Sequence, residues 1–137
     1  GLRVGFAMGN VGLIEALGRV KNSFNSYPLD AIAQCAAVAA MGDADHFHSS
    51  CQRVIASREA LCSRMASLGF QVLPSGANFI FATHPRYPAR QLFTALRERS
   101  IVVRHFDKPR IDNFLRISIG TDQDIAALLD ALAELVG

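Results

Sequence analysis

The sequence of 137 residues contains no tryptophan, only two lysines, little excess charge and no long apolar run. Its longest run of aliphatic residues, Ala36 to Met41, is far shorter than the roughly 18 residues that a membrane span requires, which excludes a transmembrane segment. The formal net charge is only +2, and the basic residues are scattered without interleaved aromatic residues. This pattern argues against a nucleic-acid-binding protein.

What the sequence does contain is a high share of hydrophobic residues, 50% of the total, against 19% charged residues. This balance excludes an intrinsically disordered chain, because such chains have too little apolar surface to bury. A chain of this length fits one domain and should bury about two-thirds of its unfolded surface. The composition therefore predicts a folded, globular protein.

The three cysteines are an odd number and show no spacing typical of a metal site. They fall on predicted helices among apolar neighbours, where a free cysteine behaves as a small hydrophobic residue. We therefore interpret Cys35, Cys51 and Cys62 as core residues of a protein in the reducing cytosol.

The sequence contains few patterns typical of metal, nucleotide or catalytic sites. The histidines include no pair at helical i, i+4 spacing backed by a carboxylate, so we expect no metal site. These histidines are His46, His48, His84 and His105. The sequence also lacks a Gly-x-Ser-x-Gly turn, a P-loop and a dinucleotide-binding glycine pattern. Lys21 and Lys108 lie in polar or loop settings rather than in an apolar pocket that would activate an amine.

The hydrophobic pattern predicts an α/β chain. Apolar spacing and capping residues indicate helices over residues 10–20, 28–41, 43–68 and 89–99, and a last helix capped by Thr121 with Asp124. Gly69 would stop the third helix. Short β-prone stretches indicate strands over residues 2–8, 70–73, 78–83, 101–104 and 114–119. From residue 70 onward these elements predict a β-β-α-β-β-α sandwich, in which helices pack on one sheet.

The first 40 or so residues differ from the rest. The sequence starts inside an expected strand, without a methionine or a signal peptide. Helix 28–41, with Pro28 in its first turn, is apolar nearly all round, which predicts that it is buried. We therefore expect these residues to border a second body, helix 43–68 to connect the two bodies, and the chain to be a piece of a longer polypeptide.

Three arginines interrupt apolar or glycine-rich surroundings. Arg3 lies between glycines in an expected strand, Arg104 ends strand 101–104, and Arg116 alternates with the apolar residues of strand 114–119. A guanidinium group presents a rigid fork that matches carboxylate and phosphate groups. Because all three could instead face solvent on half-exposed strands, the residues by themselves indicate only a candidate anion site.

Four segments, read in their order and spacing, resemble the C-terminal part of the histidinol-phosphate aminotransferase family. They are Gly1-Leu2-Arg3-Val4-Gly5-Phe6, Asn25-Ser26-Tyr27-Pro28-Leu29, Ala77-Asn78-Phe79 and Leu115-Arg116-Ile117-Ser118-Ile119-Gly120-Thr121. The first and last are specific to the wider class I and II aminotransferases. The Asn-Ser-Tyr-Pro-Leu segment and the Val-Arg ending of strand 101–104 point to the histidinol-phosphate branch. The resemblance covers essentially all of this chain, which would be well under half of such an enzyme.

Carried over by position, the resemblance implies anion-binding roles for the three arginines. It assigns Arg3 to the phosphate of the cofactor, pyridoxal 5'-phosphate, and Arg116 to the α-carboxylate of the substrate. Arg104 matches a position that helps to hold the anionic end of the substrate, such as the phosphate of histidinol phosphate. Bidentate arginines of this kind fix the register of a substrate. Tyr27 and Asn25 lie at the expected domain junction, where they would line the site, and a packing role explains them equally well.

The resemblance also implies a fold and a domain organisation. Such enzymes are pyridoxal-phosphate enzymes of fold type I. Residues 1–42 would be a remnant of the cofactor-binding large domain and the junction, and residues 43–137 would be the C-terminal small domain. The parent enzyme would be a cytoplasmic homodimer of histidine biosynthesis that transfers an amino group between histidinol phosphate and 2-oxoglutarate, with no nucleic-acid or membrane partner.

The same resemblance implies that this chain contains no catalytic residue. In the family, the Schiff-base lysine lies in a Ser-Lys motif a few residues before Gly-Leu-Arg, and the aspartate that pairs with the pyridinium nitrogen lies further upstream. Neither group is present in this sequence, and both are needed to make the cofactor an electron sink. We therefore expect the 137-residue chain itself to be inactive.

Two alternatives stay open. A neighbouring enzyme of the same class, an aromatic-amino-acid aminotransferase or a decarboxylase of threonine phosphate, would share Arg3 and Arg116 but grip the substrate side chain differently. A non-catalytic interaction module that has lost its catalytic half would belong to another functional class. The start inside a strand favours the enzyme interpretation, because an independent domain seldom begins with an unpaired strand edge.

Overall fold

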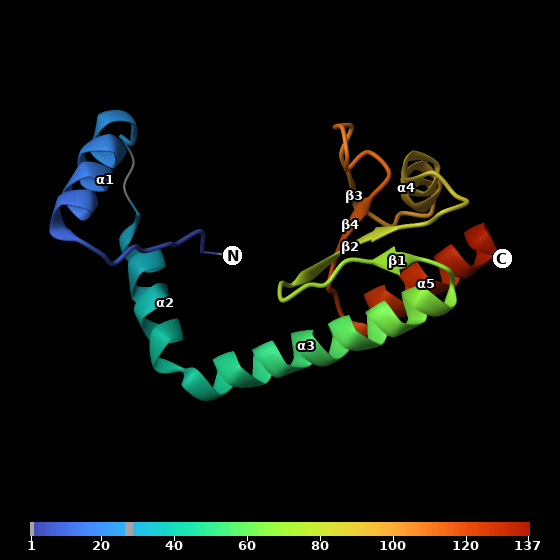
Figure 1. Cartoon of the computed structure of the whole chain (residues 1–137). Coiled ribbons are helices and arrows are strands. Elements are labelled where there is room, and N and C mark those ends of the chain that lie inside the picture. The colour runs from blue at the N-terminus through green and yellow to red at the C-terminus, as the bar shows by residue number, and fades with distance from the viewer. Residues whose placement is uncertain (1, 27–28) are drawn as a thin grey trace. The chain divides into compact units, whose positions relative to one another are not determined.

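The computed structural model describes residues 2–26 and 29–137 and divides the chain into two compact units, one up to His48 and one from Ser49 onward. The boundary between the units falls within the long helix α3 (Ala44–Ser67). Figure 1 labels the elements of both units. Within the described residues, no helix combines the length and the hydropathy needed to cross a membrane.

The first unit contains the helices α1 (Val11–Phe24) and α2 (Ala31–Gly42). The side chain of Asn10 accepts a hydrogen bond from the Gly12 amide at 2.9 Å, and this cap starts α1 where the sequence predicts. The N-cap of α2 is Asp30, whose Oδ1 accepts from the Ala33 amide at 2.8 Å. The predicted first-turn role of Pro28 lies outside the described residues.

Two predictions for this unit are wrong. Residues 2–8 form no strand, because the described part of this unit otherwise holds only helices and offers no partner strand for a ladder. Helix α2 is not buried: Ala33 is its only buried residue, while Ile32 is 80% exposed and Val38 is 74% exposed. An apolar helix is buried only where a neighbouring surface covers it, and no described element of its own unit does so.

The expectation that all three cysteines are core residues also fails. Cys35 is exposed on α2, and Cys51 is half-buried on α3. Only Cys62 packs against the hydrophobic core, and it is itself partly exposed. An apolar sequence neighbourhood therefore does not decide whether a helical side chain faces other elements.

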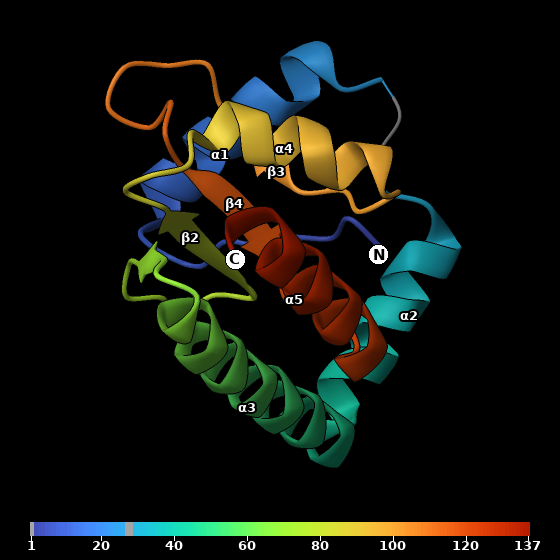
Figure 2. The same ribbon diagram turned by 90° about the vertical axis from the view of Figure 1, so that its right-hand side faces the viewer.

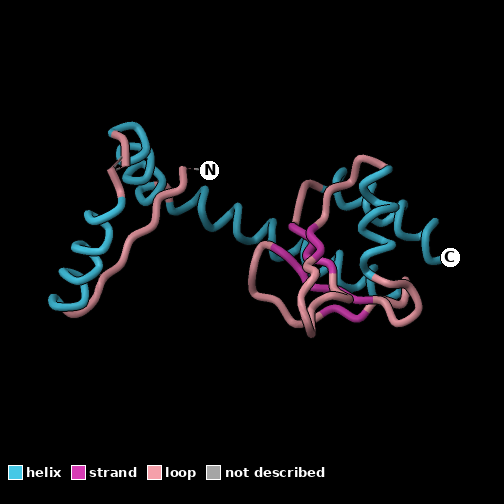
Figure 3. Tube along the Cα trace, turned by 90° about the horizontal axis from the view of Figure 1, so that it is seen from above, coloured by secondary structure: helices cyan, strands magenta, loops and turns pink. Residues whose placement is uncertain are grey.

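The second unit has the predicted β-β-α-β-β-α order after α3. Its elements are β1 (Gln71–Val72), β2 (Phe79–Thr83), α4 (Ala89–Glu98), β3 (Arg104–His105), β4 (Leu115–Ser118) and α5 (Asp122–Val136). The strands form one antiparallel sheet in the order β1-β2-β4-β3. Figure 2 shows α5 between α3 and α4, and Figure 3 shows the helices of this unit gathered beside the strands.

Alternation along the two central strands decides which face of the sheet is covered. On β4, Leu115 and Ile117 are 1% and 3% exposed, whereas Arg116 between them is only half-buried. Ile80 and Ala82 of β2 lie opposite Ile117 and Leu115 and are fully buried. These residues form one core with Leu61, Met65, Leu92, Leu96, Leu129 and Leu132 of the three helices. The side chain of Arg116 therefore projects from the face that these helices leave open.

Two helix ends in this unit follow directly from local sequence. Gly69 ends α3 with φ of +86°, a conformation that glycine adopts without strain. Thr121 and Asp124 form a complete capping box at the start of α5. The two Thr121 hydrogen bonds, from its hydroxyl and its backbone amide, lower the pKa of the Asp124 carboxyl below its ordinary value.

The strand predicted over residues 101–104 is displaced. Ser100, at φ of +62°, closes α4 in a left-handed turn, and the Ile101 amide donates to the Leu96 carbonyl at 2.9 Å. This amide is thus part of the helix end, and pairing with β4 starts at Arg104. Arg104 therefore begins strand β3 instead of ending it.

Candidate functional site

The candidate site lies on the open face of the sheet in the second unit, around Arg116 of β4. Phe81 of β2 and Arg104 of β3 are the cross-strand partners of Arg116. Directly paired residues of an antiparallel sheet project from the same face. The structure therefore brings Arg104 and Arg116 together in one row, although 12 positions separate them in sequence.

Aromatic rings surround the two guanidinium groups. The central carbon of the Arg116 guanidinium lies 5.5 Å from the ring centre of Phe79 and 5.8 Å from that of Phe106. The corresponding carbon of Arg104 lies 5.3 Å from the same Phe106 ring. Each such cation–π contact stabilises the pair by roughly 0.5–1 kcal/mol at an exposed site. The rings orient the cations without neutralising their charge.

No carboxylate of the described residues balances these two arginines. The ion pairs among the described residues are Arg90–Asp107 at 3.8 Å and Arg99–Glu134 at 3.7 Å, and neither includes Arg104 or Arg116. Like charges directly opposite each other in a sheet are destabilising. An anion bound between Arg104 and Arg116 would relieve this repulsion and use their planar donor forks, which is the chemistry that the site offers.

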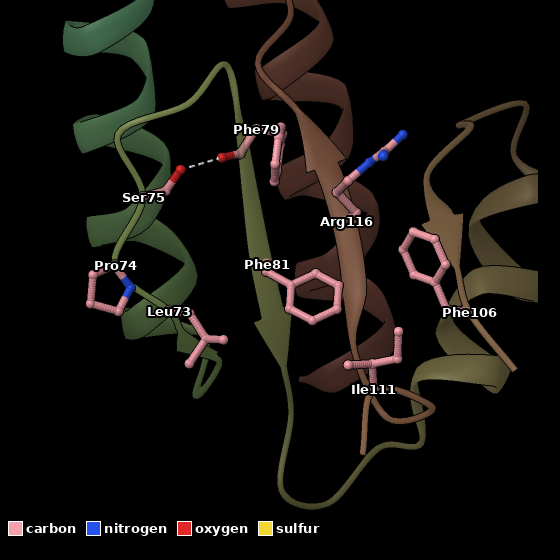
Figure 4. A pocket seen from close by; sticks show the side chains of 8 residues that line it. All are labelled: Leu73, Pro74, Ser75, Phe79, Phe81, Phe106, Ile111 and Arg116. Carbon is pink, nitrogen blue, oxygen red and sulfur yellow. Dashed lines mark hydrogen bonds between the residues drawn. The ribbon is translucent and has the colours of Figure 1, made fainter. Parts of the chain in front are cut away.

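A cavity of about 390 Å³ adjoins Arg116. Its walls are mainly apolar, and Figure 4 shows the side chains that line it from β2, β4 and the neighbouring loops. The apolar lining includes Leu73, Phe79, Phe81, Phe106 and Ile111, and Arg116 is the charged residue of the lining. The combination of one charged group with an apolar wall suits a ligand that has an anionic end and a flat or apolar body.

The loop between β1 and β2 forms one wall of this cavity and is braced from two sides. Ser75 Oγ donates to the Phe79 carbonyl at 2.6 Å and accepts from the Ala77 amide at 3.1 Å. Arg58 of α3 donates from its Nη1 to the Ala77 carbonyl at 2.9 Å. The loop that carries the Ala77-Asn78-Phe79 segment is thus tied to the helix layer.

The other predicted site residues lie in the first unit. Arg3 is exposed, forms none of the ion pairs found among the described residues, and has φ of +59°, which is uncommon for a residue with a Cβ atom. Asn25 is the C-cap of α1, and its amide donates to the Lys21 carbonyl at 3.0 Å. Tyr27 lies outside the described residues. In the described part of the chain, no three His, Cys, Asp or Glu side chains gather as metal ligands.

Comparison with known proteins decides the family. A family model for aminotransferases of class I and II matches residues 1–132. The chain belongs to this family. Among curated relatives of this chain, "Histidinol-phosphate aminotransferase 2" of Dechloromonas aromatica is 59% identical over 100% of the chain and 38% of the relative. "Histidinol-phosphate aminotransferase 1" of Methylococcus capsulatus is 59% identical over 99% of the chain and 38% of the relative.

Solved structures of this family agree on the fold of the chain. A structure titled putative histidinol-phosphate aminotransferase, from Erwinia carotovora atroseptica, matches with a TM-score of 0.85 and 28% identity over 98% of this chain and 37% of that one. The histidinol-phosphate aminotransferase of Sinorhizobium meliloti in complex with pyridoxal-5'-phosphate matches with a TM-score of 0.79 and 26% identity, over 91% and 34%. The α/β fold is thus that of fold type I aminotransferases, and the chain spans about 38% of the length of its curated relatives.

The described residues fit pyridoxal phosphate only in part. Arg3 offers an exposed guanidinium group that no described carboxylate pairs, and this suits the phosphate of the cofactor. The two lysines do not suit a covalent bond to it. Lys21 is exposed in the last turn of α1, and Lys108 is exposed in the loop after β3. Neither amine lies in the kind of apolar pocket that activates a lysine as a nucleophile.

Sequence reasoning missed the aromatic part of this site. Phe79 belongs to the Ala77-Asn78-Phe79 segment, but the sequence pattern predicts neither Phe79 nor Phe106 as a site residue. Their contacts with Arg104 and Arg116 depend on the pairing of β2, β3 and β4 across long sequence separations. A weak signal exists, because Phe106 follows Arg104 by two positions and strand alternation would place both on one face.

Proposed function

We propose that this chain is the C-terminal part of a histidinol-phosphate transaminase, which transfers an amino group between histidinol phosphate and 2-oxoglutarate. The observation that carries the proposal is the pairing of Arg104 with Arg116 on the open face of the sheet, with no described carboxylate to neutralise them. The names of the curated relatives support the same substrate class. Residues 1–42 would belong to the large domain and the junction, and residues 43–137 would form the small domain.

The chemistry of the two substrates requires this kind of site. Histidinol phosphate carries a phosphate group, whereas 2-oxoglutarate carries carboxylates, and both must present a reacting carbon at the same place. A guanidinium fork can bind either kind of oxyanion in a bidentate manner. Arg116, on the central strand β4, would hold the anionic group, and Arg104 would add a second fork for the phosphate. Fixing the anion in this way orients the rest of the substrate.

The bound cofactor would supply the electron sink that lets an amino group move between two carbon atoms. Arg3 would contribute to holding its phosphate, and Asn25 and Tyr27 would line the site. The sequence contains no Ser-Lys pair, and neither of its lysines is buried. We therefore propose that the 137-residue chain, incubated with pyridoxal phosphate, histidinol phosphate and 2-oxoglutarate, shows no turnover. Robust activity of this chain alone would contradict the proposal.

The test of the substrate assignment is a pair of arginine variants in a full-length enzyme that contains this sequence. Arg116→Ala removes charge-assisted hydrogen bonds, each worth roughly 1.5–3 kcal/mol, so kcat/KM should fall about 10- to 100-fold or more for both substrates. Arg104→Ala should raise KM for histidinol phosphate far more than KM for an unphosphorylated amino donor. The matched control is Arg97→Ala, at an exposed position of α4, which should leave kcat/KM and KM unchanged for each of these substrates.

Substrate profiling separates this assignment from its alternatives. A preference for phenylalanine over histidinol phosphate would identify an aromatic-amino-acid aminotransferase instead. Release of carbon dioxide from threonine phosphate would identify a decarboxylase. If the full-length protein binds neither cofactor nor substrate, the non-catalytic interaction module is the better description. We further propose that the full-length enzyme is a cytoplasmic homodimer, which sedimentation and fractionation would test.

A further inference from the structure

The ring of Phe106 is shared by the two arginines of the site. Its centre lies 5.3 Å from the Arg104 guanidinium carbon and 5.8 Å from that of Arg116. Arg116 has a second ring, Phe79, at 5.5 Å. Among the described residues, Phe106 is the one ring found beside Arg104. The orientation of Arg104 thus depends on Phe106 more than that of Arg116 does.

Phe106 is itself held in place by other aromatic residues. It meets Phe81 edge-on, with 6.2 Å between ring centres and 63° between ring planes. Phe81 in turn stacks on Phe114 at 4.7 Å with nearly parallel rings. Figure 4 shows Phe79 and Phe106 on either side of Arg116, with Phe81 between the strands below. The ring under Arg104 is therefore part of a packed aromatic group and not a freely rotating side chain.

We propose that Phe106 is a positioning residue that holds Arg104 beside Arg116 and thereby favours phosphate-bearing ligands over carboxylates. This inference rests on the proposed function of the site. A carboxylate has two oxygens, which one guanidinium fork satisfies. A phosphate monoester has three terminal oxygens and more negative charge, so it can use a second fork. Arg104 is exposed on an edge strand, and a long side chain in that position loses rotamer freedom when it binds. The Phe106 ring already restricts the Arg104 side chain in the free protein, so less rotamer freedom is lost when the ligand binds.

Anion binding to the 137-residue chain tests the proposal without any catalytic reaction. The arginine Nε–Hε signals in NMR spectra are followed during titration with inorganic phosphate and, separately, with acetate. In Phe106→Leu, which keeps apolar bulk but removes the ring, the dissociation constant for phosphate should rise about two- to fivefold, and that for acetate by a smaller factor, below about twofold. Phe106→Tyr should restore phosphate binding. Phe93→Leu is the matched control, because this half-buried ring lies beside His105 and forms none of the cation–π contacts found among the described residues.

A double-mutant cycle separates positioning from a general structural role. In an Arg104→Ala background, Phe106→Leu should change phosphate affinity by less than about twofold, because the residue through which it acts is gone. An equal loss of phosphate and acetate binding would overturn the proposal. So would a full-sized effect of Phe106→Leu in the absence of Arg104, or phosphate binding in Phe106→Tyr no better than in Phe106→Leu.

Kinetics of the full-length enzyme then distinguish this inference from the proposed function. Phe106→Leu should raise KM for histidinol phosphate about two- to fivefold and leave kcat within about twofold, because Phe106 acts on substrate binding through the orientation of Arg104. A fall in kcat with unchanged KM would overturn the positioning role. If the enzyme does not accept histidinol phosphate at all, the proposed function is wrong. The ratio of phosphate to acetate binding then still decides whether Phe106 positions Arg104.

Discussion

Replacing Gly69 by alanine tests how the end of α3 is built against the buried His84. Gly69 has φ of +86°, and a Cβ atom at this position would lie 2.9 Å from His84 Nε2. His84 is only 3% exposed, its Nε2 lies 3.2 Å from the Leu68 carbonyl oxygen, and its Nδ1 accepts from the Arg86 amide. The imidazole ring is thus held between backbone groups and has little room to move away.

The loss of stability expected for Gly69→Ala has two parts. A left-handed conformation costs a residue with a Cβ atom roughly 1–2 kcal/mol. Overpacking against a held ring adds about 1–3 kcal/mol. Gly69→Ala should therefore lower the free energy of unfolding of this unit by about 2–5 kcal/mol. In a His84→Ala background the steric part disappears, so the same substitution should cost only about 1–2 kcal/mol.

The assay is urea unfolding monitored by the helical signal in circular dichroism, because the sequence has no tryptophan whose fluorescence could report unfolding. Gly76→Ala is the matched control, because a Cβ atom there would meet no other atom within 4 Å. It should change stability by less than about 0.5 kcal/mol. An equal cost of Gly69→Ala with and without His84 would refute the steric argument. A cost below about 0.5 kcal/mol would refute the left-handed turn as well.

Two further predictions concern helix N-termini. The lowered pKa of Asp124 means that its contribution to α5 is present above the ordinary carboxyl value of 3.8 and is lost as pH falls through the lowered value. Thr121→Val should move this pKa back toward 3.8 in a carboxyl NMR titration, and an unchanged value would contradict the assignment of its cause. Asn113→Ala should lower stability by about 1 kcal/mol, since Asn113 Oδ1 accepts from the Ala89 amide at 2.9 Å, whereas Asn113→Asp keeps that acceptor.

Local chemistry explains why several elements could be predicted. The capping box of Thr121 with Asp124, the Asn10 cap and the Gly69 stop each involve residues at most a few positions apart. Alternation along β4 likewise predicted that Arg116 projects away from the apolar face. Each of these features depends on one helix turn or one strand, so its signal is contained in a short stretch of sequence.

Features that depend on a distant partner could not be predicted in this way. Residues 2–8 have β-strand composition but no partner strand among the described residues of their unit, and α2 is apolar but uncovered by them. At helix α4 a distant partner supplies what the local sequence lacks. Its N-cap residue, Pro88, forms no side-chain cap, and Asn113, 24 positions after Ala89, accepts from the Ala89 amide instead. Composition indicates which secondary structure a segment favours, whereas the available packing partners decide whether it forms a strand and whether it is buried.

The amino-acid sequence by itself determined the order of the elements in the second unit, the ends of several helices and the resemblance to class I and II aminotransferases. The tertiary structure alone decided that Arg104 and Arg116 stand side by side and share the ring of Phe106. The physical reason is the antiparallel pairing of β3 with β4. Hydrogen bonds between backbones set that register, and side chains far apart in sequence become neighbours only when the strands pair.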